Sequence, residues 1–363
     1  MPEPTTLRFF LGANSAQGFV SRFDQLGDPQ DGWRCTIIKG GPGTGKSSSM
    51  KRLAAAMAPR CRYIEEIYCS SDLDSLDGVI FPDHKLSVAD GTPPHTLEPT
   101  FPGAYETIHS LCDCWDDQQL YDNRKAVMGL VAQCGRLHKS VSSYLYAAGS
   151  LLGQLQQMAD EQTDHAKVLR LAASLAAREL RPTGRAGGEK IRFVSGVTNR
   201  GPHCFQETIA ALCPRRIALD DAWGSASSLL LSTLRQLALE NGHQVITCAC
   251  PLFPFTKIDH LLLPELGLAF VTQNKLHPIT LPVERTIHAR RFLDMERLHA
   301  KKHRMAFLHR AAVNMLEQAG NLLGEAKETH DLLEMYYIAA MDFDKVDAKA
   351  DELIARFQEM AQA

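Results

Sequence analysis

The sequence has no apolar run approaching the length of a membrane-spanning helix and no large excess of charge of one sign. Its formal net charge is −3 over 363 residues, so no whole-molecule field favours nucleic acid or an anionic membrane surface. The opening residues, Met1-Pro2-Glu3-Pro4, lack the basic and then apolar order of a signal peptide. These absences argue against a membrane protein and do not indicate nucleic-acid binding, and we expect a cytoplasmic protein.

Cysteine pairs with the C-x-x-C spacing of zinc sites are also absent, although the chain has 10 cysteines. The closest pairs, Cys112-x-Cys114 and Cys248-x-Cys250, have a different spacing and no accompanying pair that would complete a ligand set. Cys35 and Cys248 lie within apolar, strand-like stretches, where free thiols are usually buried. We therefore expect reduced, mostly buried cysteines and no structural metal.

One strong motif is present. Residues 40–47 (GGPGTGKS) fit the phosphate-binding pattern G-x-x-x-x-G-K-[ST], between a short apolar strand at 35–39 and a helix at 47–57. In this pattern backbone N–H groups surround a polyphosphate, Lys46 meets the β- and γ-phosphates, and the Ser47 hydroxyl ligates Mg²⁺. The alternative is a glycine-rich turn that only precedes a helix. The predicted nucleotide-binding residues are Gly40, Gly41, Pro42, Gly43, Thr44, Gly45, Lys46, Ser47 and Ser48.

The chain also contains an internal repeat. Residues 7–12 (LRFFLG) recur as residues 191–196 (IRFVSG), and Pro82 to His95 matches Pro264 to His277. Because the matches keep their order at a nearly constant offset, they indicate a duplication.

Each half is predicted to be an α/β lobe followed by a long helical segment. Strand-like pieces at 7–11, 35–39, 63–69 and 85–89, with a helix between the second and third, imply a parallel, helix-covered sheet. The predicted fold is a P-loop NTPase parallel sheet duplicated within the chain. The predicted divisions are a P-loop NTPase lobe at 1–114, a helical segment and linker at 115–185, a degenerate P-loop-like lobe at 186–292 and a helical segment at 293–363.

Composition predicts the helical segments. From Trp115 to about Leu180 proline is absent and glycine is sparse, and a helix is expected over 167–180. Residues 295–357 repeat this character, with a bend expected at 342–344. Such helices more often bury a packing stripe than bind a cofactor.

The second half has lost the motif. The corresponding loop, residues 220–228 (DDAWGSASS), contains no lysine and one glycine, and its two carboxylates would repel polyphosphate. In the first half an apolar strand ends in Asp90, which could hold the Mg²⁺ water shell or orient an attacking water, as a Walker-B acid does. Asp90 aligns with Thr272 in the repeat. The sequence thus predicts one working site, in the first half, unless Asp90 is only a turn residue before Gly91.

Other carboxylates stay open as candidates. Asp72, Asp74 and Asp77 follow the third strand and could act on Mg²⁺ or on a nucleophile, or form a local capping turn. A rival assignment makes Asp220 or Asp221 the Walker-B acid for Lys46, which would require the intervening helical segment to be an insertion.

Three features have no assigned chemistry. His95 has a counterpart, His277, in the half that has lost the motif, which favours a structural hydrogen bond over a catalytic role. Residues 12–15 form a loop that could lie near the site. No arginine can be assigned as a finger that contacts the γ-phosphate; the available ones are Arg8, Arg52, Arg192 and Arg200.

Segments 39–47, 69–78, 90–95 and 337–343 (KGGPGTGKS, CSSDLDSLDG, DGTPPH and YIAAMDF) together resemble an uncharacterised family of bacterial P-loop ATPases with two nucleotide-binding-like halves. The similarity covers nearly the whole chain and implies ATP and Mg²⁺ but no substrate. Typical members keep a glycine-rich loop with lysine in the second half, and this chain departs from them at 224–228.

Three functions are expected to compete. The first is a Mg²⁺-dependent ATPase whose single site, with Lys46 and Asp90, drives movement of the lobes or helical arms. The second is a small-molecule kinase, with Asp72 or Asp74 accepting the proton of a substrate hydroxyl. The third is a nucleotide-gated module with negligible turnover, whose helical arms contact a protein partner.

Overall fold

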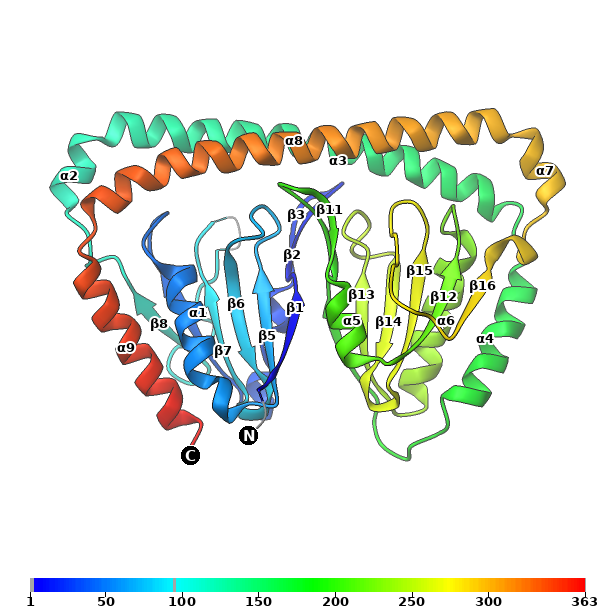
Figure 1. Cartoon of the computed structure of the whole chain (residues 1–363), viewed down its shortest axis with the longest axis horizontal. Helices are drawn as coiled ribbons and strands as arrows, with labels where there is room; N and C mark the ends of the chain where they lie inside the picture. The colour runs from blue at the N-terminus through cyan, green and yellow to red at the C-terminus, as the bar shows by residue number, and fades with distance from the viewer. Residues whose placement is uncertain (1–2, 94–95, 363) are drawn as a thin grey trace.

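The computed structural model describes residues 3–93 and 96–362. Two α/β lobes lie side by side beneath a pair of long helices (Figure 1). His95, one of the two matched histidines, lies outside the described residues.

Each lobe is built on a six-stranded sheet, and the two sheets have the same topology. The first has the order β1-β5-β6-β7-β4-β8 and the second, taken from its β9 edge, β9-β13-β14-β15-β12-β16, with matching pairing directions. The repeat predicted from the sequence is therefore present as two similar lobes. The first sheet comprises β1 (Thr5–Phe9), β4 (Arg34–Lys39), β5 (Tyr63–Tyr68), β6 (Leu76–Phe81), β7 (Leu86–Asp90) and β8 (Glu106–Ser110); the second comprises β9 (Gly188–Arg192), β12 (Arg215–Asp220), β13 (Gln244–Ala249), β14 (Ile258–Leu263), β15 (Leu268–Gln273) and β16 (Arg285–His288).

Both sheets are mixed, which corrects the expectation of a purely parallel sheet. β6 pairs antiparallel with β5 and β7, whereas the other neighbours in the first sheet pair parallel. The chain returns from β5 to β6 through residues 69–75 and from β6 to β7 through the 3-10 turn Pro82–His84. Parallel neighbours need a crossover of about a dozen residues or more, so these short connections dictate hairpins.

The helices complete the repeat. In the first lobe β4 leads into α1 (Lys46–Met57), and in the second lobe β12 leads into α6 (Ser225–Glu240). A hairpin comes before each of these two strands in the chain: β2 (Gly12–Ser15) with β3 (Gly18–Ser21), and β10 (Ser195–Thr198) with β11 (Gly201–Cys204). The second lobe adds α5 (Gln206–Leu212). The helical segments are α2 (Asp117–Asp122), α3 (Arg124–Asp160), α4 (His165–Glu179), α7 (Met295–Ala300), α8 (Lys302–Ala340) and α9 (Phe343–Met360).

The helical segments cross between the lobes. The long helices α3 and α8 pack against each other along the top of both lobes (Figure 1), so that α3 runs from the first lobe to the second and α8 returns. Consequently α4 packs on α6 of the second lobe and α9 packs on α1 of the first. Phe357 of α9 lies 5.8 Å from Phe81 between ring centroids and is fully buried. The bend expected at 342–344 is confirmed, because α8 ends at Ala340 and the Asp342 carboxylate caps α9 by accepting from the Lys345 N–H.

The lobes meet at a contact with local two-fold character. Phe10 and Phe193 exchange backbone hydrogen bonds of 2.8 and 3.0 Å. Beside them the Arg192 guanidinium donates to the buried Glu65 carboxylate at 3.0 Å, and Lys190 lies 3.3 Å from the same carboxylate. Burial raises the pKa of Glu65, but Arg192 and then Lys190 outweigh burial and hold that pKa below its usual range. The ion pair therefore joins the second lobe to β5 of the first.

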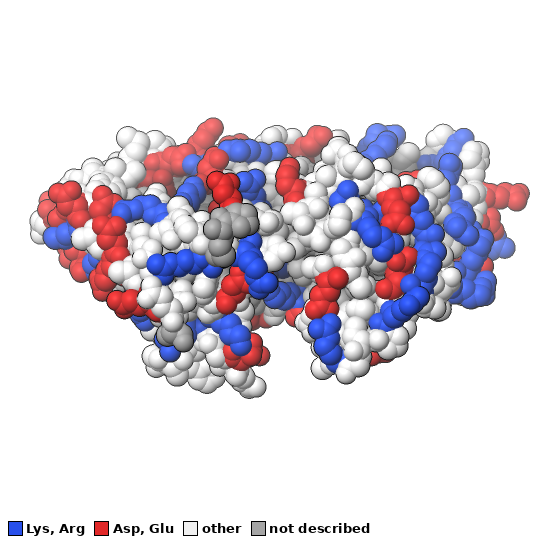
Figure 2. Space-filling view, turned by 60° about the horizontal axis from the view of Figure 1, so that its bottom comes forward, with Lys and Arg blue, Asp and Glu red and all other residues white. Residues whose placement is uncertain are grey.

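Acidic and basic side chains both occur on each lobe on the face in Figure 2. Acidic ones are more frequent at the outer side of the first lobe and basic ones at the outer side of the second. Within the described ranges, no helix has the length and apolar character needed to cross a membrane. Most of the cysteines are buried, and all are free thiols.

Candidate functional site

The glycine-rich loop joins β4 to α1 at the edge of the first sheet that the carboxyl ends of β4 and β7 form. The helix begins at Lys46, one residue before its expected start, and Gly45 is its N-cap residue with φ of 86°. Gly43 also has a positive φ, of 65°, and this left-handed backbone region is open mainly to glycine. The first-turn N–H groups of α1 have no partners within the helix and carry the positive end of its dipole. The loop therefore has the geometry of an anion-binding turn.

Lys46 and Asp90 lie next to each other at this edge. The Lys46 Nζ is 3.6 Å from the Asp90 Oδ2 and donates to the Gly41 carbonyl at 2.6 Å. Both side chains are largely buried, with exposed fractions of 10% and 14%. Strand register brings them together, because β7 pairs parallel with β4 and sets Asp90 opposite Ile38. The ends of parallel strands meet at one edge of a sheet, which is where ligands of open α/β sheets bind.

The other predicted site residues hold the loop. The Thr44 hydroxyl donates to the Gly41 carbonyl at 2.9 Å, and the Ser47 Oγ accepts from the Leu76 N–H at 2.9 Å. The Asp90 Oδ1 accepts from the N–H and the hydroxyl of Thr92 at 2.9 and 2.6 Å. Asp90 therefore combines the turn role considered in the sequence with an approach to Lys46 by its second oxygen.

The carboxylates that follow β5 are engaged elsewhere. The Asp72 Oδ2 lies 3.5 Å from Lys327 Nζ of α8, and Asp74 pairs with Arg200 from the β10–β11 turn of the second lobe. Asp77 is buried on β6. Among the described residues, no ion pair joins Asp72 to Lys46; Asp72 links the first lobe to α8, and Asp74 links it to the second lobe.

Each of the four available arginines has a carboxylate partner. Arg8 lies 3.8 Å from Glu66, and Arg52 pairs with Asp347 and Asp351 of α9. Arg192 and Arg200 pair with Glu65 and Asp74, as described above. An arginine that contacts a γ-phosphate would have to leave its partner first.

The end of α8 covers the glycine-rich loop. The Glu334 Oε1 accepts from the Gly43 N–H at 3.2 Å, and a β-carbon at Gly41 would lie 2.5 Å from the Tyr337 ring. Only glycine at position 41 allows this approach. A carboxylate thus occupies a backbone donor of the loop, in the manner expected of a phosphate oxygen.

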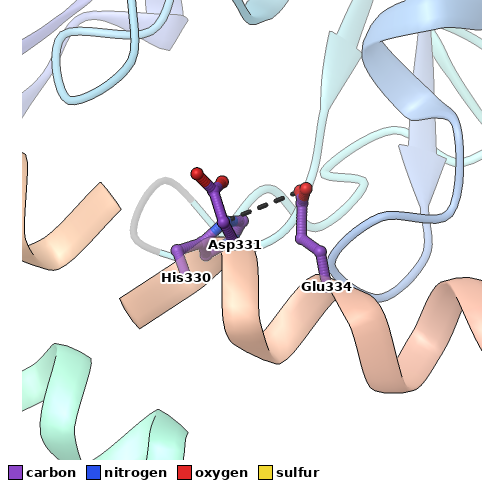
Figure 3. Close-up of side chains that lie close together, drawn as sticks. All are labelled: His330, Asp331 and Glu334. Atoms are coloured by element: carbon purple, nitrogen blue, oxygen red, sulfur yellow. Dashed lines mark ion pairs between the residues drawn. The ribbon is translucent and has the colours of Figure 1, made fainter. Parts of the chain in front are cut away.

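Glu334 belongs to a group of three possible metal ligands on α8 (Figure 3). His330, Asp331 and Glu334 offer ligand atoms within 4.8 Å of one another, and the His330 Nδ1 lies 3.5 Å from the Glu334 Oε1. Asp331, however, is paired with Lys327. Because Glu334 contacts Gly43, we assign this group to the contact between α8 and the loop and not to a metal.

In the equivalent loop of the second lobe, the Asp221 carboxylate occupies the N–H donors of the turn. The loop comprises residues 221–224, is shorter than the 40–45 loop, and also ends in an N-cap glycine, Gly224, with φ of 74°. The buried Asp221 carboxylate accepts from the N–H groups of Trp223, Gly224 and Ser227 at 3.1, 3.0 and 2.8 Å. The donors that would bind phosphate are therefore satisfied internally.

The rival Walker-B assignment does not agree with the topology. Asp220 ends β12, a strand of the second sheet, and pairs with His288 at 2.7 Å. Register also sets Thr272 opposite Leu219, which matches the position of Asp90 opposite Ile38. Thr272 is thus the structural counterpart of Asp90, and β12 is not a strand of the sheet that holds Lys46.

Comparison of the chain with models of protein families, with curated proteins and with solved structures gave no match in any of the three. The resemblance to P-loop ATPases therefore depends on the motifs alone, whereas the two similar α/β lobes are a property of the structure.

Sequence reasoning did not identify Glu334, Lys327 or Tyr337 as neighbours of the first-lobe loops. All three lie on α8, which follows the second lobe in the chain. The only signal was the segment 337–343, which the family resemblance includes. Asp221 was recognised as unfavourable to phosphate but not as the group that fills the turn.

Proposed function

We propose that the protein binds ATP at residues 40–48 and hydrolyses it with Mg²⁺ at this single site. The observation that carries the proposal is the pairing of Lys46 with Asp90 across the ends of β4 and β7, at 3.6 Å. A cation at a P-loop and a carboxylate on the next strand are the side chains that phosphoryl transfer to water requires. The second lobe has Thr272 and a filled loop at the corresponding places, which supports one site and not two.

The residues present fit the magnesium ion that this chemistry needs. Ser47 and Asp90 offer hydroxyl and carboxylate oxygens, the ligand atoms that Mg²⁺ prefers. When bound, Mg²⁺ would neutralise phosphate charge. The chain itself would hold the β- and γ-phosphates with Lys46 and backbone N–H groups. Thr92, by donating to the Asp90 Oδ1, would keep the carboxylate oriented with its Oδ2 toward Lys46.

A second function, the nucleotide-gated module, is favoured by the cover that α8 forms over the loop. A triphosphate cannot use the Gly43 N–H while Glu334 accepts from it, and the two carry like charges. In this proposal nucleotide binding displaces the end of α8, and α3 packed along α8 transmits the change to the second lobe. A protein partner would then recognise the arms in one of the two states. Both functions use the same site and differ in turnover.

The kinase alternative has less support. Asp72 and Asp74 are each paired with a cation, and a general base must first be released from such a partner. A hydroxyl substrate would have to displace Lys327 or Arg200.

The test uses the full chain with ATP and Mg²⁺ and measures binding, phosphate release and ADP formation. Lys46→Ala should weaken ATP binding by roughly 10- to 100-fold, the value of a lost charged hydrogen bond, and remove turnover. Ser227→Ala is the control, because Ser227 lies in the first turn of the equivalent helix of the second lobe and its Oγ has no partner among the described residues. Unchanged ATP affinity and turnover in Lys46→Ala would reject the site. Phosphate release with ATP alone supports the ATPase, binding without turnover supports the module, and ADP formation only with an added hydroxyl substrate supports the kinase.

A further inference from the structure

The site described above does not account for a cavity of about 910 Å³ between the second lobe and the helices α3 and α8. It lies at the carboxyl edge of the second sheet, where the loops after β12, β13 and β15 approach α3 and α8. This is the edge that carries the glycine-rich loop in the first lobe, and it is the edge where open α/β sheets bind ligands. The lobe has thus lost the phosphate loop but has kept a cavity beside it.

Lys257 gives this cavity a buried cation. The Lys257 Nζ lies 3.2 Å from the Asp259 Oδ1, and a β-carbon at Gly224 would lie 3.5 Å from the same Nζ. Burial lowers the pKa of Lys257, but the Asp259 carboxylate outweighs burial and raises that pKa above its usual range. A charged lysine from the β13–β14 connection therefore reaches the 221–224 loop, although the helix after that loop supplies none.

His277 is the second polar group of the cavity wall. Its Nε2 lies 3.4 Å from the Asp259 Oδ2, its side chain is only 11% exposed, and its Nδ1 is buried with no partner among the described residues. Burial lowers the pKa of His277, which keeps the ring neutral near pH 7. Within the described ranges, the Nδ1 is therefore a buried polar atom without a partner in the wall of the cavity.

The rim and the remaining wall indicate the class of ligand. Lys275 and Arg310 lie at the rim, and no ion pair is recorded for either within the described residues, whereas Glu317 is the acid there. The wall is largely apolar and aromatic, and it includes Trp223 and Leu316. Polyphosphate does not fit the loop, because Asp221 already fills its N–H donors.

We propose that this cavity binds a small organic monoanion with an aromatic or apolar body, its charge among Lys257, Lys275 and Arg310 and its body against Trp223. This site would make the second lobe a sensor or substrate site with its own ligand and not only a scaffold. The proposal does not depend on ATP binding at the first lobe.

The test compares two fluorescent probes of nearly equal shape on the full-length protein. Anilinonaphthalene sulfonate carries a single negative charge, and phenylnaphthylamine has the same body without it. We expect the sulfonate to bind about tenfold more tightly than the amine, the effect of roughly 1.4 kcal/mol. The double variant Lys275→Gln/Arg310→Gln should weaken the sulfonate roughly fivefold and leave the amine unchanged, since each rim cation contributes a partly screened attraction.

Two controls locate the probe. Arg136→Gln/Lys139→Gln removes two exposed cations from α3 outside the cavity and should change neither affinity. Trp223→Phe should reduce energy transfer from protein to bound probe, because Trp223 is one of three tryptophans and lines the cavity. Benzoate should displace the sulfonate where benzamide does not.

The proposal is overturned if the two probes bind equally, if the rim variant behaves like the α3 control, or if Trp223→Phe leaves energy transfer unchanged. Lys46→Ala should keep full sulfonate binding, so that failure of the ATP site and failure of this site remain distinguishable.

Discussion

Removing the Glu334 carboxylate should strengthen ATP binding. Glu334 accepts from the Gly43 N–H at 3.2 Å, and its side chain is 33% exposed. A partly exposed charged hydrogen bond of this kind is worth about 1 kcal/mol, below the value for a buried one. Repulsion between Glu334 and a phosphate charge about 4 Å away adds about 1 kcal/mol in a water-like medium. The sum, about 1–2 kcal/mol, corresponds to roughly 5- to 30-fold tighter binding.

The measurement is calorimetric titration of Glu334→Ala with ATP and Mg²⁺ against the wild-type chain. Asp331→Ala is the matched control, because it removes the same charge from the preceding turn of α8. Asp331 pairs with Lys327 and not with the loop. We expect little change in the control. If Glu334→Ala binds ATP no better than Asp331→Ala, α8 does not compete with nucleotide and the gating argument is refuted.

Three further predictions concern stability, each measured by urea unfolding. Arg192→Met should destabilise the protein by about 3–5 kcal/mol because it leaves Glu65 buried without its main partner. Adding Glu65→Gln should restore most of the lost stability, and a double variant as unstable as Arg192→Met would contradict the role given to this ion pair. Phe357→Ala should cost about 3–5 kcal/mol by opening a cavity between α9 and the first sheet, and a cost below about 1 kcal/mol would show that α9 is not docked as described. Burial lowers the pKa of His260 to about 3, so the contribution of its neutral form to stability is present above pH 6.5 and is lost as the pH falls toward 3. Between pH 7 and pH 5 His260 alone should lower the free energy of unfolding by about 2 kcal/mol, and His260→Leu should flatten this pH dependence. A wild-type stability equal at both pH values would contradict the last prediction.

Much of the first lobe could be predicted because its signals are local. The strands at 35–39 and 85–89, the helix at 47–57 and the turn between them follow from apolar runs and glycines that are adjacent in the chain, and the structure has them with shifts of about one residue. β6 was missed, and its direction depends on the short connections on either side. The duplication was visible because the order of matches does not depend on folding.

The neighbours of the glycine-rich loop could not be predicted in the same way. Glu334 is 291 residues from Gly43 in the chain, and the contact exists only because α8 starts over the second lobe and ends over the first. The buried Lys257–Asp259 pair has a local spacing, yet its place beside Gly224 depends on how β14 lies in the sheet. Contacts between distant segments follow from packing, and no periodicity within one segment encodes them.

The repeat, the α/β character of the two halves and the one loop with lysine can all be read from the amino-acid sequence, since each is a pattern of neighbouring residues or of their order. The pairing of Asp90 with Lys46, the Asp221 carboxylate in the second loop and the Glu334 carboxylate over the first follow from the folded arrangement instead. Charge and hydrogen bonding act over a few ångströms in space, and strand register and the packing of α3 along α8 set which groups come within that range.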